Sequence, residues 1–128
     1  MLRRHKYSLI ALGVYWPLVF VLTHMRIPAA VRRSGMSDKT MHVMAFFVLT
    51  LLVWWAISPY QRIVWTRAKV WMVAGVLIAY GAMDEYLQGF IGRSSEVADF
   101  IANVFGIIFA LGVLSVFDDI AHVVDAGV

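Results

Sequence analysis

The chain has 128 residues, of which 62% are hydrophobic and 15% are charged, and its mean hydropathy is +0.78. A soluble domain of this length cannot bury so much apolar surface, so the composition indicates an integral membrane protein. The absence of cysteine excludes disulfides, thiolate metal sites and thiol nucleophiles. The net charge of +3 is weak evidence for an acidic partner, because basic residues flank membrane spans in any case. No nucleic-acid-binding motif is found, so the expected partners are membrane lipids and not nucleic acid.

Four apolar runs follow one another along the chain, each close to the ~20 residues that a helical span needs. They predict an all-α fold, a bundle of four transmembrane helices in a single domain over residues 1–128. The expected spans cover residues 7–24, 41–57, 70–88 and 97–117.

The first run follows three basic residues within positions 3–6, a pattern that also occurs in cleaved signal peptides. Tyr-Trp-Pro at residues 15–17 interrupts the run, and no small-x-small cleavage site follows it directly. We therefore expect a retained first span. Basic residues are nearly balanced between the two sides, and reserving Lys39 and Arg93 for a site favours a cytoplasmic N-terminus. The expected location is the cell membrane, with several passes.

Polar residues that membrane spans rarely tolerate occur at the start of the second span, the end of the third and the start of the fourth. A carboxylate near the bilayer centre costs about 2.5–3.5 kcal/mol, so such residues are candidates for a functional site. Spans alternate in direction, which places all three positions on one side of the membrane. The candidate residues are Asp38, Lys39, His42, Asp84, Glu85, Gln88, Arg93, Asp99 and Asn103. Each group contains two members four residues apart, on one helix face, so we expect a shared polar pocket open to one interface.

Each of these residues also has a structural explanation when it is taken alone. Asp38 could be a helix N-cap, His42 a hydrogen-bonded histidine of the bundle, and Asn103 a link between helices. Glu85 lies about 100° around the helix from the preceding residue and could face water. His24 is expected at the surface or the membrane interface. For the whole set, a shared site is the stronger interpretation.

The three groups occur in order as Asp38-Lys39-x-x-His42, Asp84-Glu85-x-x-Gln88, and Arg93 followed by Asp99 and Asn103-x-x-Gly106. In this order and spacing they resemble the VanZ-like family of small membrane proteins over about residues 38–112. Phe46 and Phe47 match the aromatic that the family carries after its histidine, whereas the loop at residues 89–92 departs from the longer or proline-containing loop often found there. The resemblance implies a protein of the cell envelope. The family's namesake is linked to low-level resistance to teicoplanin, a lipidated glycopeptide antibiotic.

Two functions are open at this stage. In the first, the site is an enzyme that modifies an amphiphile or lipid headgroup at the interface, with Lys39 and Arg93 holding an anionic group. The catalytic residues would then be His42, Asp84, Glu85 and Asp99, and the substrate-binding residues Asp38, Lys39, Gln88, Arg93 and Asn103. In the second, the protein is a non-catalytic accessory module, whose polar network fixes the bundle and recognises a lipid or amphiphilic small molecule. The sequence leaves open whether there is catalysis.

We expect no cofactor and no bound metal. His42 with the carboxylates Asp84, Glu85 and Asp99 would suit a first-row divalent ion, but the two basic residues of the cluster oppose cation binding. Gly106 and Gly112 on the fourth span are small residues that allow close helix approach. Gly75, Gly81 and Gly106 could pack against helices of this chain or of a second copy. A homo-oligomer therefore stays open.

Overall fold

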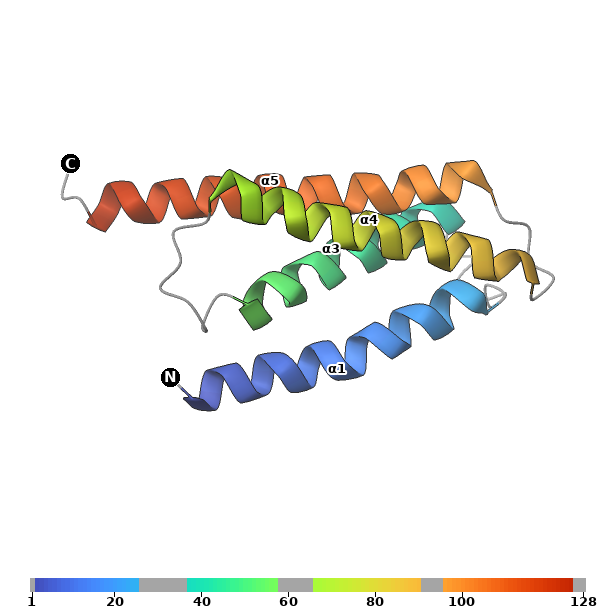
Figure 1. Ribbon diagram of the computed structural model, residues 1–128, viewed down its shortest axis with the longest axis horizontal. Coiled ribbons are helices and arrows are strands. Elements are labelled where there is room, and N and C mark those ends of the chain that lie inside the picture. The colour runs from blue at the N-terminus through green and yellow to red at the C-terminus, as the bar shows by residue number, and fades with distance from the viewer. Residues whose placement is uncertain (1, 26–36, 58–65, 91–95, 126–128) are drawn as a thin grey trace.

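The computed structural model describes residues 2–25, 37–57, 66–90 and 96–125. These residues form four antiparallel helices that lie side by side along the long axis of the molecule (Figure 1). The helices are α1 (Leu2–His24), α3 (Asp38–Ile57), α4 (Arg67–Phe90) and α5 (Val97–Asp125). Each contains a segment that is long and apolar enough to cross a membrane. The predicted all-α four-helix bundle is confirmed, and the four apolar helices support a multi-pass membrane protein.

Helix α3 begins three residues before the predicted span because Ser37, and not Asp38, caps it. The Thr40 N–H donates to Ser37 Oγ at 3.2 Å, and the Met41 N–H donates to the Ser37 carbonyl oxygen at 3.2 Å. The explanation of Asp38 as an N-cap is therefore wrong. Asp38 and Lys39 instead lie in the first turn of α3.

The other helices also extend beyond the predicted spans. Helix α4 begins at Arg67, because the Thr66 carbonyl oxygen accepts hydrogen bonds from the N–H groups of Lys69 and Val70. Helix α5 continues past the predicted end at residue 117 to Asp125, since no glycine or proline interrupts residues 118–125. The spans were predicted from apolar runs alone, and these runs are shorter than the helices that contain them.

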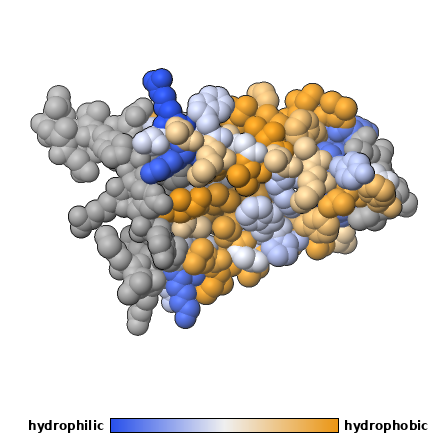
Figure 2. Space-filling model, in the orientation of Figure 1, coloured by the Kyte–Doolittle hydropathy of each residue, from blue (hydrophilic) through white to orange (hydrophobic). Residues whose placement is uncertain are grey.

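Helix α3 is the central element of the bundle. It packs against α5 and α1, while α4 packs against α5 and α1. Whether the first span is retained stays a prediction. The buried core comprises Val19, Phe46, Leu49, Val53, Val73, Ala74, Leu77, Ile107 and Leu111. Large apolar side chains also face outward along the helices, as lipid contact requires, and Figure 2 shows a mostly apolar band between the hydrophilic ends.

Helix α5 packs closely against the backbone of α3 at Gly106. A Cβ built on Gly106 would overlap the carbonyl oxygen of Val43 and lie 3.1 Å from the backbone nitrogen of Phe47. A side chain at this position would therefore push α5 away from α3. Gly112 has no atom within 4 Å of a built Cβ, so the expectation that it also allows close approach is wrong for this chain's own described helices.

We expect the Gly106→Ala substitution to destabilise the bundle, because the added methyl group meets backbone that cannot rotate away. Overpacking of this kind costs about 1–3 kcal/mol. Thermal unfolding in detergent micelles, followed by far-UV circular dichroism, measures the effect. Gly112→Ala on the same helix is the matched control, since its methyl group enters open space. Equal unfolding temperatures for the two variants would contradict the close crossing at Gly106.

Candidate functional site

Polar side chains gather at the end of the bundle where α1 and α4 end and where α3 and α5 begin (right in Figure 1). Most of these side chains are buried, although the segments around them are apolar. The buried polar residues at this end are Thr23, His42, Asp84, Glu85, Gln88, Asp99 and Asn103. The structure thus confirms the central expectation from the sequence, that polar residues of three separate spans meet at one end.

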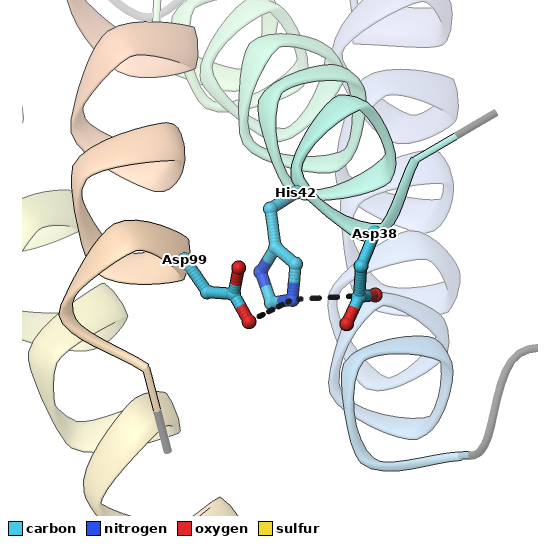
Figure 3. A group of neighbouring side chains, drawn as sticks. All are labelled: Asp38, His42 and Asp99. Atoms are coloured by element: carbon cyan, nitrogen blue, oxygen red, sulfur yellow. Dashed lines mark ion pairs between the residues drawn. The ribbon is translucent and has the colours of Figure 1, made fainter. Parts of the chain in front are cut away.

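His42 lies at the centre of this cluster and is only 2% exposed. Its Nδ1 atom is 2.9 Å from the side-chain oxygen of Asn103 on α5. An amide oxygen can only accept a hydrogen bond, so with this amide orientation Nδ1 carries the proton and donates. The other ring nitrogen, Nε2, points between two carboxylates, 4.0 Å from Asp38 Oδ1 and 3.9 Å from Asp99 Oδ2 (Figure 3). These separations are too long for direct hydrogen bonds.

Helix α4 joins the cluster through Glu85 and Gln88. Glu85 Oε1 lies 3.9 Å from His42 Nδ1, and its side chain is 7% exposed. The Gln88 side-chain amide donates to Glu85 Oε1 at 3.3 Å and to Asp84 Oδ2 at 3.1 Å. Gln88 reaches both carboxylates because residues three and four positions apart share a helix face. Glu85 therefore faces the cluster rather than water, and a continuous set of polar contacts runs from α5 through α3 to α4.

Helix α1 contributes a residue that sequence reasoning assigned to the surface or interface. His24 Nδ1 lies 3.6 Å from Asp84 Oδ1, and the His24 side chain is only 7% exposed. The same nitrogen lies 2.7 Å from the Phe20 carbonyl oxygen, and the ring stacks on Phe20 with 4.0 Å between centroids. His24 is intermediate in overall exposure at the end of α1, as expected, but its contact with Asp84 was not predicted, although alternation of the spans already placed the end of α1 on the same side as the other polar groups.

Lys39 is engaged by carboxylates at the outer rim of the cluster. Its Nζ atom lies 3.1 Å from Glu96 Oε2 and 3.5 Å from Asp99 Oδ1, and half of its side chain is exposed. Glu96 was not among the predicted site residues; its carbonyl oxygen also accepts the N–H groups that begin α5. Arg93, the second predicted anion-binding residue, lies outside the described residues, so its role stays a prediction.

The electrostatics of this end favour negative side chains near two helix N-termini. Asp38 and Asp99 lie in the first turns of α3 and α5, where the helix dipole stabilises a carboxylate. The carboxylates described at this end are Asp38, Asp84, Glu85, Glu96 and Asp99, against the single described ammonium group of Lys39. In this part of the chain the site is therefore richer in hydrogen-bond acceptors and negative charge than in cations.

Aromatic side chains separate the polar cluster from the apolar middle of the bundle. The Tyr80 ring lies 5.3 Å from Trp16 and 5.7 Å from Phe46, measured between centroids. Phe46 follows His42 by one helical turn and is completely buried. The buried charged, imidazole and amide side chains of the described residues thus lie at one end, whereas the buried polar residues elsewhere, Ser8 and Thr50, carry only hydroxyl groups. This distribution favours a site at a membrane interface.

The structure brings eight of the nine predicted site residues to one end of the bundle: Asp38, Lys39, His42, Asp84, Glu85, Gln88, Asp99 and Asn103. Comparison with protein-family models, with curated proteins and with solved structures found no match. The site is therefore interpreted from its own geometry, and the resemblance to VanZ-like proteins rests on the motifs.

A double-mutant cycle tests the contact between His42 and Asn103. Asn103→Ala leaves the buried His42 N–H without its acceptor, so we expect a loss of about 1–3 kcal/mol in the free energy of unfolding. Once His42→Ala is present, the same substitution should cost less, because no donor is left to satisfy. Reversible unfolding in mixed micelles gives the four free energies.

The control pairs His42→Ala with Ser115→Ala, since Ser115 hydrogen-bonds to the carbonyl oxygen of Leu111 within its own helix. These two substitutions should be additive within about 0.5 kcal/mol. Additivity of the His42 and Asn103 substitutions would contradict the contact.

Proposed function

We propose that the chain is a VanZ-like protein of the cell membrane, and that its polar cluster recognises the headgroup of an amphiphile at one membrane interface. With a cytoplasmic N-terminus, this interface is the outer one. The observation that carries the proposal is a set of buried polar atoms on three helices that have no hydrogen-bond partner among the described residues. Three of them, one from each helix, are His42 Nε2 on α3, Gln88 Oε1 on α4 and Asn103 Nδ2 on α5.

Unsatisfied buried polar atoms cost about 1–3 kcal/mol each, so a network that served only to fix the helices would be expected to satisfy its own members. Two of these three atoms can accept a hydrogen bond, and Asn103 Nδ2 can only donate. A headgroup that supplies both donors and an acceptor, such as hydroxyl or ammonium groups beside a phosphate or ester oxygen, complements them. The abundance of carboxylates around His42 favours the hydroxyl or ammonium part of such a headgroup.

The position of the cluster suits a molecule that is anchored in the bilayer. Headgroups lie at the membrane interface, which is the depth at which the ends of the four helices meet. An apolar groove follows the outer face of α5 from Ile101 to Phe117, beginning within one turn of Asp99. Ile101 lies about 200° around α5 from Asp99, so this groove faces lipid on the side of the helix away from the cluster, and the proposal rests on the depth of the cluster and not on the groove.

Modification of the headgroup is the second candidate. Its support is the orientation of His42, whose Nδ1 is fixed by Asn103 while Nε2 points away from that bond. A neutral imidazole held in this way can accept a proton through Nε2 and act as a general base. The unsatisfied atoms argue against the other alternative, a cluster that is purely structural.

Native mass spectrometry of the protein released from nanodiscs of phosphatidylethanolamine and phosphatidylglycerol tests the recognition of headgroups. We expect the wild-type protein to retain lipid, and Gln88→Leu and Asn103→Leu to retain about tenfold less, as the loss of one buried hydrogen bond implies. Ser115→Ala, farther along α5, is the control and should retain lipid as the wild type does. Each variant is first shown to be helical and folded.

Equal lipid retention by all four proteins would refute the proposal. A headgroup-labelled lipid in the same nanodiscs distinguishes the two candidates. Turnover that is lost in His42→Ala supports modification, whereas retention without turnover supports recognition alone.

A further inference from the structure

Asp38, His42 and Asp99 have the arrangement of a metal-binding site. One ligand atom from each of Asp38, His42 and Asp99 can be chosen so that all three lie within 4.8 Å of one another. Asp38 and His42 are one helical turn apart on α3, a spacing that places two ligands on one face, and Asp99 approaches from α5 (Figure 3). Two helices thus contribute an imidazole and two carboxylates that converge on one point.

The distances leave room for an ion between the side chains. His42 Nε2 lies 4.0 Å from Asp38 Oδ1 and 3.9 Å from Asp99 Oδ2. Bonds from a zinc ion to nitrogen and oxygen ligands are about 2.0–2.2 Å long, so a tetrahedral ion would draw each carboxylate about 0.5 Å closer to the histidine. Rotation of the aspartate side chains provides a movement of this size without moving either helix.

The Nδ1 atom of His42 makes the kind of hydrogen bond that orients histidines in metal sites. Such histidines almost always donate their other N–H group to a carbonyl or carboxylate oxygen, which fixes the tautomer and the ring orientation. Here the Nδ1–H group donates to Asn103 Oδ1 at 2.9 Å. His42 is only 2% exposed. With Nδ1 protonated, the lone pair of Nε2 points toward two carboxylate oxygens, and a cation between these three atoms would stabilise the arrangement.

The positive charge of Lys39 is expected to oppose cation binding, but its ion pairs with Glu96 and Asp99 reduce this repulsion. Its Nζ atom contacts Glu96 at 3.1 Å and the Oδ1 atom of Asp99 at 3.5 Å, which leaves Asp99 Oδ2 directed at His42. Glu85 adds a further carboxylate, 3.9 Å from His42 Nδ1. Around His42, the described carboxylates outnumber the described ammonium group.

We propose that Asp38, His42 and Asp99 bind one first-row divalent cation of the type that combines imidazole and carboxylate ligands, such as Zn²⁺ or Mn²⁺. Three protein ligands leave coordination positions open to water or to an oxygen of a bound molecule, as in catalytic metal sites. From the sequence, no bound metal is expected, and the alternative ligand set is Asp84 and Glu85 with His42 and Asp99. The geometry replaces those two residues with Asp38. This inference does not depend on recognition of a headgroup. A bound ion would occupy His42 Nε2, which could then neither accept a hydrogen bond from a headgroup nor act as a general base.

Titration of metal-depleted protein in detergent with Mn²⁺ or Zn²⁺ alone, by isothermal calorimetry, tests the site. We expect one ion per chain, and binding about 10–100-fold weaker in Asp38→Asn and in Asp99→Asn, which keep the side-chain shape and remove the charge. Asp118→Asn is the matched control, because it makes the same chemical change on α5 nineteen residues beyond Asp99, outside the proposed site. It should bind with an affinity close to that of the wild type.

Pulsed electron paramagnetic resonance of the Mn²⁺-loaded wild-type protein provides a second, independent measurement. It should detect a directly coordinated nitrogen, and His42→Ala should abolish that signal. Absence of the nitrogen signal, absence of binding to the wild type, or equal weakening by Asp118→Asn would each overturn the proposal. Lipid retention by the metal-depleted protein, measured as above, shows separately whether headgroup recognition holds.

Discussion

The close crossing of α3 and α5 is the contact on which the rest of the site depends. At Gly106 the two backbones come so near that a methyl group would overlap the Val43 carbonyl oxygen. One turn nearer the polar end, this proximity brings His42 and Asn103 within hydrogen-bonding distance. A larger residue at position 106 would separate the helices, and the histidine would lose both its fixed tautomer and its fixed orientation. A glycine in the apolar part of the bundle thus determines the geometry of the polar part.

Several charges of the polar cluster have a local compensation, which helps an apolar chain to tolerate them. Asp38 and Asp99 lie at helix N-termini, where backbone N–H groups and the helix dipole favour a carboxylate. Gln88 bridges the two carboxylates of α4. His42 is held between these groups, with hydrogen-bonding capacity left over on three helices. Such leftover capacity is costly in a folded protein, and binding of a ligand or an ion is the use that best accounts for it.

Much of this arrangement could be predicted from the sequence, since alternation of four apolar spans is enough to place the polar groups at one end. The i,i+4 spacings also identified the helix faces. The direction of Glu85 and the contact of His24 with Asp84 could not be predicted, because they depend on how each helix is rotated about its axis. The capping of α3 by Ser37 and the rim pair of Lys39 with Glu96 depend on where helices begin, which apolar runs do not define.

The different surroundings of Gly106 and Gly112 could not be predicted from the sequence either. Both are small residues on the same helix, two turns apart, and only the crossing with α3 gives one of them a structural role. Likewise, the spacing of Asp38 and His42 is visible in the sequence, but the approach of Asp99 Oδ2 to His42 is a product of the packing of α5 on α3.

The most direct test of the shared site is a distance measurement in a lipid bilayer. Solid-state nuclear magnetic resonance of protein labelled with ¹⁵N in histidine and ¹³C in asparagine reports whether His42 Nδ1 lies next to the Asn103 side-chain carbonyl carbon. The 2.9 Å contact between His42 Nδ1 and Asn103 Oδ1 predicts a strong correlation that disappears in Asn103→Ala. Absence of this correlation in the folded wild-type protein would show that α3 and α5 do not deliver their polar side chains to one place, and would contradict the account.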